Sequence, residues 1–522
     1  MPPGTPQQPF TARSTRAALC AMLGVSAALR FAACLRGGQY FFGDEERYDR
    51  GVRLYLALAH GDWASARAVV AMPEHPLFAW VGAAVTAAQH LLAQATRFGD
   101  WGAHPEGVTF TMGLGACVLS LFSTANILLV YRAARGLGAE REEALWAALL
   151  MAASNTSFYF SRHLLPYDCA IFACLLSLAV CLRAPAAWRA AAGGALAACS
   201  YLVYNGYWFL PAAAASSLLV AWSGLPGRRA LAGSWAAGFA LALGLALAAG
   251  TLAGGAAYWS TMAAFSRSAT QGLFAEGWSL PWAYLWESEG PAGAAAAACI
   301  VLAGAGSLLG ARAAGARPLA WLAALGAGYC LLTLMSSGLG HFVVYGRTVK
   351  ALVPFVCLAA GWAVRSLAAG RRLARAAAAA LIAGSGAWHA WAHLQRVFPR
   401  EFEVSVLRGW GNPKRSLSVS GSLYVPLAMP VARPDLALVN AQFLYPVRGY
   451  IGFPQGETIL RAQNPLSYRP YQYEGFTPRE RAILRSGDIS MRLIRLRDPS
   501  GVPDDLPAAL RYDPSERPSG LR

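Results

Sequence analysis

The chain has 522 residues, of which 56% are hydrophobic and 14% are charged, and its formal net charge is +17 at neutral pH. A mean hydropathy of +0.38 and several apolar runs of membrane-spanning length, about 20 residues, exclude an ordinary water-soluble protein. The arginines of the apolar region cluster in loops, as the positive-inside rule requires of cytoplasmic loops. The net charge therefore indicates membrane topology, and no nucleic-acid partner is expected.

The first apolar run, residues 17–35, is predicted to be a retained span, because it lacks the small-residue cleavage site of a signal peptide. Arg13 and Arg16 precede it, which places the N-terminus in the cytoplasm. Threading the chain so that each later arginine cluster is also cytoplasmic predicts an all-α polytopic membrane protein with about eleven transmembrane helices. The predicted spans are residues 14–35, 107–131, 143–160, 166–183, 190–206, 208–223, 230–254, 291–311, 318–337, 349–367 and 374–393.

A polar loop, residues 37–108, follows the first span on the outer side and begins with the stretch FFGDEERYDRGVRLYLALAHGDW. Asp44 and Glu45 stand a few residues beyond the span, where partial desolvation raises the basicity of a carboxylate and suits it to act as a general base. An ordinary solvated acidic loop is the alternative interpretation. The residues from Asp44 onward have the pattern of an amphipathic helix, with Tyr48 on its apolar side, which can lie flat on the membrane.

The apolar stretch LFAWVGAAVTAAQHLLAQA, later in the same loop, is predicted to be a second interfacial helix on the outer membrane face. If it were a span, every later basic loop would change sides. The preceding MPEHPLF places Glu74 and His75 at its start. Other segments predicted on this side carry ionisable residues near span ends, namely FSRHLLPYD, with Arg162, Tyr167 and Asp168, and GHFVVYGRTVK, with His341, Arg347 and Lys350.

Carboxylates and cations are thus predicted to converge on one membrane face. A carboxylate can take a proton from an acceptor, and Arg, Lys or His can stabilise an anionic leaving group. This combination fits group transfer from a lipid-linked phosphate. The structural alternatives are snorkelling of Arg347 and Lys350 at a span end, pairing of Arg162 with Asp168, and a solvated or structural His341.

These motifs resemble those of the C-type membrane glycosyltransferases that use polyprenyl-phosphate sugars. They are most similar to the protein O-mannosyltransferase-like group that includes the lipid A aminoarabinose transferase. The segments that carry the resemblance are GDEERYDRGVRLYLALAHGDW, PEHPLFAW, RHLLPYDCAIFACLL and YGRTVKALVPFVCLAAG. The chain departs from the family pattern at Gly43, where proline is usual, and at His75, where lysine is common. The resemblance implies that Asp44 is the catalytic carboxylate, that transfer occurs on the outer face, and that no dedicated nucleotide-sugar site exists.

The ten cysteines lie in or beside apolar spans without a CxxC pair, and are predicted to be small packing residues. No tightly bound metal or cofactor is therefore expected, although a loosely bound magnesium or manganese ion shared by Asp44, Glu45 and a phosphate is left open. Residues 1–393 are expected to form the transmembrane domain. Residues 394–498 are predicted to form a small extracytoplasmic α/β domain, and residues 499–522 a disordered end.

The sequence thus predicts a glycosyltransferase of the bacterial inner membrane that moves a sugar from a polyprenyl-phosphate carrier to a lipid, glycan or protein acceptor. Asp44 would act as the base, and the predicted substrate-binding residues are Glu45, Tyr48, Glu74, His75, Arg162, Tyr167, Asp168, His341, Arg347 and Lys350. Two alternatives have no such chemistry: a transporter or flippase of lipid-linked sugars, and a non-catalytic subunit of an envelope polysaccharide assembly system. A transporter is expected to show repeated halves and mid-span charges, whereas the charges noted here lie at span ends.

Overall fold

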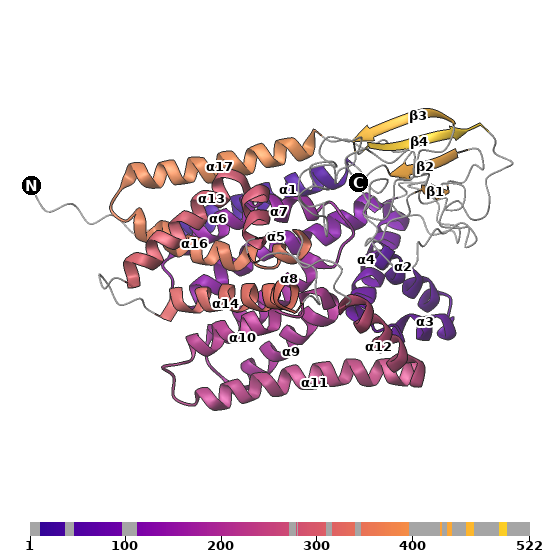
Figure 1. Cartoon of the computed structure of the whole chain (residues 1–522), viewed down its shortest axis with the longest axis horizontal. Coiled ribbons are helices and arrows are strands. Elements are labelled where there is room, and N and C mark those ends of the chain that lie inside the picture. The colour runs from indigo at the N-terminus through magenta and orange to yellow at the C-terminus, as the bar shows by residue number, and fades with distance from the viewer. Residues whose placement is uncertain are drawn as a thin grey trace, which may run out of the picture.

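The computed structural model of the protein describes residues 11–36, 46–96, 112–270, 278, 280–308, 316–339 and 346–395, and four strand segments within 428–497. Up to residue 395 the described chain is a bundle of helices (Figure 1). The helices up to the middle of the bundle are α1 (Ala12–Cys34), α2 (Glu46–Ala59), α3 (Trp63–Val70), α4 (Pro76–Thr96), α5 (Met112–Gly136), α6 (Arg141–Ala153), α7 (Asn155–Phe160), α8 (Tyr167–Arg183) and α9 (Ala187–Val203). The 3-10 turn η2 (Asn205–Tyr207) is followed by α10 (Leu210–Ala221), α11 (Arg228–Gly254), α12 (Ala256–Thr270), α13 (Leu280–Leu308), α14 (Ala316–Thr333), the π-helical turn η3 (Leu334–Gly338), α15 (Gly346–Lys350), α16 (Val353–Leu367) and α17 (Arg372–Leu394).

Five of the described helical segments are long and apolar enough to cross a membrane, so the protein is a helical membrane protein. They are Ala12–Cys34, Gly113–Gly136, Arg228–Gly254, Ser288–Ala305 and Arg317–Gly338, and each overlaps a predicted span. The other six predicted spans coincide with helices that are shorter, interrupted or more polar, such as α10 and the α6–α7 pair.

One of the predicted spans contains a break, and a bend lies directly before another. The span predicted at residues 143–160 is divided at Ser154, where α6 ends and α7 begins. The carboxylate of Glu289 accepts hydrogen bonds there from the Ser154 hydroxyl (2.9 Å) and from the backbone N–H groups of Asn155 (2.7 Å) and Thr156 (3.0 Å). An anion thus satisfies donors that the first turn of a helix otherwise leaves unpaired. Beside Glu289, α13 bends at Gly290, whose φ of +60° suits glycine.

The outer loop contains the two helices predicted from its sequence, α2 and α4, with the short α3 between them. The helices α2 and α4 cross where Gly51 meets Gly82. A Cβ atom on Gly51 would lie 2.5 Å from the Gly82 Cα atom, so this close approach requires glycine.

The described contacts show which of the segments between helices lie at the same end of the bundle. At the end predicted to be cytoplasmic, Arg317 donates to the Gly138 carbonyl (2.7 Å) and Arg365 pairs with Glu140 (2.8 Å). At the opposite end, Arg162 Nε donates to the Ala33 carbonyl (3.0 Å), and α2, α3 and α4 lie there (Figure 1). The segments that the sequence assigns to one side of the membrane therefore lie together.

After α17 the described residues form a four-stranded antiparallel sheet in the order β1-β2-β4-β3. Its strands are β1 (Ala428–Pro430), β2 (Leu436–Asn440), β3 (Gly456–Gln463) and β4 (Ser490–Leu496). The strands β2 and β4 lie in the two runs from which the sequence predicts strands. The predicted helical part of this domain and the predicted disordered end, residues 499–522, fall outside the described residues.

Candidate functional site

The structure describes eight of the eleven predicted site residues, whereas Asp44, Glu45 and His341 lie outside the described residues. Seven of the eight have side chains that are almost fully buried, and Glu74 is partly exposed. The seven are Tyr48, His75, Arg162, Tyr167, Asp168, Arg347 and Lys350.

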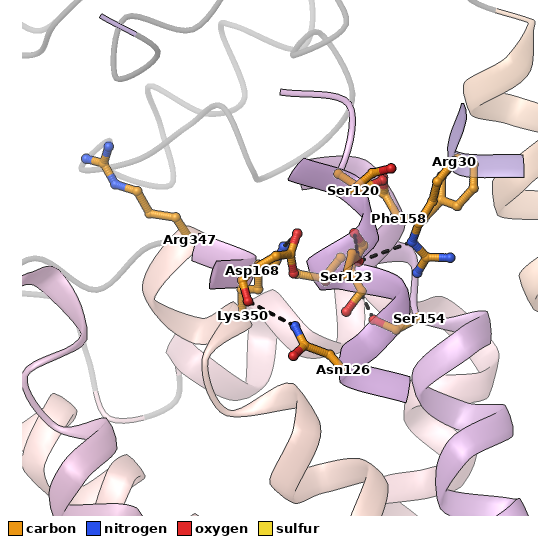
Figure 2. A network of polar contacts seen from close by, with 12 residues as sticks. Arg30, Ser120, Ser123, Asn126, Ser154, Phe158, Asp168, Arg347 and Lys350 are labelled. Atoms are coloured by element: carbon orange, nitrogen blue, oxygen red, sulfur yellow. Dashed lines mark hydrogen bonds and ion pairs between the residues drawn. The ribbon is translucent and has the colours of Figure 1, made fainter. Parts of the chain in front are cut away.

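The centre of the site is a buried ion pair between Asp168, in the first turn of α8, and Lys350, the last residue of α15. Lys350 Nζ lies 2.9 Å from Asp168 Oδ2 and 5.0 Å from the centre of the Phe160 ring. Asn126 on α5 donates to the Asp168 carbonyl at 3.1 Å (Figure 2). The other carboxylate oxygen, Oδ1, is buried and has no hydrogen-bond partner among the described residues.

This pair corrects two structural alternatives from the sequence. Lys350 does not snorkel to an aqueous surface, because its side chain is completely buried and ion-paired. Asp168 pairs with Lys350, and its alternative partner, Arg162, instead donates from Nε to the Ala33 carbonyl at the end of α1. The sequence does not predict this ion pair, because Asp168 and Lys350 lie far apart in the chain.

Arg30 is not among the predicted site residues, and it lies in the apolar span α1 with only 1% of its surface exposed. Its Nε donates to the Ser123 hydroxyl (3.1 Å), its guanidinium lies 5.5 Å from the centre of the Phe158 ring, and it is attracted electrostatically to Asp168. Figure 2 shows Arg30 and the Asp168–Lys350 pair on opposite sides of α5. An arginine inside an apolar run is the signal that identifies such a residue, since charge at membrane depth is costly and is usually kept for function.

A second group of missed residues, Tyr204 and Tyr207, connects the predicted site residues through aromatic contacts. The Tyr204 ring lies 4.8 Å from both the His75 and Tyr167 rings and 4.7 Å from the Tyr207 ring, measured between centroids. Arg347 Nη1 approaches the Tyr167 hydroxyl at 3.4 Å, and the Tyr207 hydroxyl donates to the Arg347 carbonyl at 2.5 Å. The signal in the sequence that indicates this group is the stretch YLVYNGYWFLP, whose tyrosines and asparagine interrupt an otherwise apolar region.

His75 attaches the outer loop to this aromatic group by two reciprocal hydrogen bonds. Its backbone N–H donates to Asn205 Oδ1 (2.7 Å), and the Asn205 backbone N–H donates to His75 Nδ1 (3.1 Å). Because Nδ1 accepts, a neutral His75 carries its proton on Nε2, which lies 3.5 Å from Glu74 Oε1. His75 has a φ of +51°, an uncommon backbone conformation for a residue other than glycine. The two hydrogen bonds with Asn205 hold the His75 backbone in this conformation and offset its cost.

Glu74 is neutralised by two arginines of α2. Arg50 Nη2 lies 2.5 Å from Glu74 Oε2, and Arg47 Nε lies 3.6 Å from Oε1. Burial alone would raise the pKa of Glu74, but the adjacent His75, Arg47 and Arg50 lower it to about 2. Burial, aided by the positive charge of Arg47, lowers the pKa of His75 well below 6.5. Glu74 is therefore an ionised anchor for α2.

Tyr48 occupies a structural position between the two outer-loop helices. It is fully buried, and its hydroxyl donates to Gln89 Oε1 at 2.9 Å. This hydroxyl also lies close to Gly115 of α5. The described contacts do not bring Tyr48 to the Asp168–Lys350 pair, so its interactions support the outer-loop helices.

The free energy of opening the outer loop should decrease as the pH falls below 6.5. When the loop is unfolded or detached, His75 takes up a proton near pH 6.5, its ordinary pKa. Burial prevents this protonation in the folded loop. The stabilisation of the loop by neutral His75 is therefore present above pH 6.5 and is lost below it, by up to about 1.4 kcal/mol per pH unit. The contribution of Glu74 is lost only as the pH falls toward about 2. Hydrogen exchange of α2 and α4 at several pH values measures this dependence.

The matched control for this experiment is His75→Asn, since asparagine tolerates a positive φ and does not titrate near neutral pH. The variant should show a flatter dependence than the wild-type protein between about pH 7.5 and about pH 5.5. An identical slope in both proteins would contradict the assignment to His75.

The described residues contain no group of three His, Cys, Asp or Glu side chains that could hold a metal ion. The predicted ligands of a loosely bound cation, Asp44 and Glu45, are not among these residues. No family model and no curated protein matches the chain. The chemical interpretation therefore depends on the site itself, which combines buried cations, one buried carboxylate and aromatic rings at one end of a membrane bundle.

Proposed function

We propose that the protein is a membrane glycosyltransferase that moves a sugar from a polyprenyl-phosphate carrier to an acceptor hydroxyl on the outer face of a bacterial inner membrane. The supporting observation is a set of buried cations at the end of the bundle that holds the outer loop. Lys350 pairs there with Asp168 at 2.9 Å, while Arg347 approaches the Tyr167 hydroxyl and Arg162 donates to the Ala33 carbonyl. Cations in a poorly solvated site suit the recognition of a phosphate, since interactions with an anion are stronger there than in water.

In the proposed reaction, Asp44 takes the proton of the acceptor hydroxyl, and the resulting oxygen attacks the anomeric carbon of the sugar. The bond between that carbon and the phosphate oxygen breaks, and polyprenyl phosphate leaves. Arg347, Lys350 and Arg162 stabilise the negative charge that grows on the leaving phosphate, and His341 is a further candidate. The unpaired Oδ1 of Asp168 can accept a hydrogen bond from a sugar hydroxyl, and Glu45 orients the sugar or the acceptor.

The structure changes the proposed roles of two predicted residues. Glu74 and His75 hold α2 and η2 in place through Arg50 and Asn205, which positions the chain that leads back to Asp44. They act on the substrate through this placement, in addition to any direct contact with the sugar. Tyr167 aligns Arg347 through its hydroxyl.

Transfer should persist in excess chelator, because Asp44 can act as a base without a metal and the arginines supply the positive charge. The measurement is sugar transfer by purified protein before and after treatment with a divalent-ion chelator. Loss of activity that is restored by magnesium or manganese would instead support the loosely bound ion at Asp44 and Glu45.

The proposed topology has about eleven spans, a cytoplasmic N-terminus and an extracytoplasmic sheet domain. A reporter that fluoresces only in the cytoplasm, fused after Arg400, should stay dark, whereas the same reporter fused before Arg13 should fluoresce. Fluorescence from the fusion after Arg400 would contradict the topology, and with it the outer location of the site.

The function is tested by comparing lipid-linked sugars and envelope glycans in cells with and without the protein. We expect the deletion strain to accumulate one polyprenyl-phosphate sugar and to lack the same sugar on one acceptor. Asp44→Asn should reproduce the deletion, whereas wild-type protein should restore the product. Accumulation of the carrier on the cytoplasmic face alone, with transfer unaffected once the carrier is supplied outside, would favour a flippase.

A further inference from the structure

Two cysteines lie at the two ends of the outer loop. Cys34 is the last residue of α1, and Cys117 lies in the second turn of α5, so the chain between them includes the whole acidic motif. Both side chains are buried, with exposed fractions of 0% and 6%, and both belong to the same hydrophobic cluster. The two ends of this long loop therefore leave from helices that pack against each other, each with a buried cysteine near its outer end.

The Cys117 thiol lies against the last turn of α1, which carries Cys34. Cys117 Sγ lies 3.9 Å from the Phe31 carbonyl oxygen, which also accepts the Leu35 N–H at 2.9 Å in the last turn of α1. Cys34 is in the same turn, and its thiol donates to the Ser161 carbonyl at 3.3 Å. The two thiols also interact electrostatically with each other. Other buried cysteines have a different environment: the Cys174 thiol, for example, donates to the Leu210 carbonyl.

We propose that Cys34 and Cys117 form a disulfide bond that closes the outer loop in the mature protein. The proposal rests on the outward placement of this end of the bundle in the proposed topology, because disulfides form and persist in the oxidising bacterial periplasm. Packing of the two helix ends then buries the bond and protects it from reductants.

The bond forms by thiol–disulfide exchange with a disulfide-carrying oxidoreductase of the envelope. The thiolate of one cysteine attacks a sulfur of the carrier disulfide and forms a mixed disulfide, and the second cysteine then displaces the carrier thiolate. The cysteines lose two electrons and two protons, and the carrier disulfide becomes a dithiol. Because both cysteines become buried, the exchange takes place before α1 and α5 finish packing.

As a consequence for the site, the loop that carries Asp44 and Glu45 would start and end at fixed points. A cross-link between residues 34 and 117 removes conformational freedom from the unlinked chain between them. It also fixes the helix ends from which the loop leaves and to which it returns. The sequence predicts only a packing role for both cysteines, because neither belongs to a short cysteine motif and their proximity depends on the α1–α5 contact.

The test is thiol trapping in full-length protein from intact cells. Cells are acidified, the protein is denatured and alkylated without reductant, and its peptides are analysed by mass spectrometry. We expect a linked pair of peptides containing Cys34 and Cys117, two hydrogens lighter than the sum of the separate peptides, with Cys174 alkylated. Reduction before alkylation should separate the pair. Alkylation of both Cys34 and Cys117 without reductant would overturn the proposal.

Matched variants separate this inference from the proposed function. Cys174→Ser should keep the link, whereas Cys34→Ser should leave Cys117 fully alkylated. The Asp44→Asn variant should retain the link, because the base takes no part in its formation. Two free thiols in protein that transfers sugar normally would overturn the disulfide alone, and a linked protein without transfer activity would overturn the glycosyltransferase alone.

Discussion

Asp44→Asn is expected to lower the rate of sugar transfer at least about a hundredfold, since general-base catalysis typically contributes about 10²–10⁴-fold. The substitution preserves the size of the side chain and removes its ability to accept the acceptor proton. Melting temperature and binding of the lipid carrier should remain close to the wild-type values. The measurement is the single-turnover rate of transfer with purified protein at saturating donor.

Glu46→Gln is the matched control for Asp44→Asn. It removes the same charge two residues further along the chain, at the start of α2, and should reduce transfer only slightly. Near wild-type transfer in Asp44→Asn together with an inactive Glu46→Gln would show that the base is assigned to the wrong residue. Near wild-type transfer in both variants would mean that the acidic motif is a solvated surface without a catalytic role.

Asp168→Asn should lower the free energy of unfolding by about 3–5 kcal/mol, because it leaves a buried charge without its partner. That charge is Lys350, whose side chain is completely buried. The expected result is a large decrease in melting temperature in detergent and weak expression. Arg365→Gln provides the comparison, since Arg365 pairs with the largely exposed Glu140 and such a pair contributes about 0–1 kcal/mol.

The double variant Asp168→Asn/Lys350→Met distinguishes a structural pair from a functional one. Removing both charges should recover most of the lost stability, as in other buried ion pairs replaced by neutral residues. Transfer should nevertheless remain low, because the proposed phosphate-binding cation is gone. Full recovery of both stability and transfer would contradict the role of Lys350 in catalysis and leave the pair purely structural.

The sequence predicted the helices well because apolar length and arginine placement report directly on membrane insertion. The helices α1, α5, α11 and α14 lie within a few residues of their predicted ranges. The break at Ser154 was missed, since it is stabilised by a contact between distant segments, whereas the bend at Gly290 falls directly before the predicted span 291–311. Glu289 compensates for the break, and no local pattern around Ser154 predicts that a carboxylate from α13 supplies hydrogen-bond acceptors there.

The eight described residues of the predicted site are nearly all buried, and the contacts between them were not predictable from the sequence. Asp168 and Lys350 were both identified, yet their contact depends on how α15 packs against α8. Arg30 was overlooked because it lies within an otherwise apolar run. Tyr204 and Asn205 were overlooked because their importance comes from neighbours, Tyr167 and His75, that are distant in the sequence.

The most direct test of the central claim is release of polyprenyl phosphate by purified protein in lipid nanodiscs. Lipid-linked sugars extracted from the source membranes serve as donors, and an extract of envelope glycans and lipids serves as the acceptor. The proposed function predicts that wild-type protein and Glu46→Gln release polyprenyl phosphate in proportion to sugar transferred, and that Asp44→Asn releases at least about a hundredfold less. Intact donor with wild-type protein, combined with protein-dependent movement of that donor across the bilayer of sealed vesicles, would contradict a glycosyltransferase and identify a transporter.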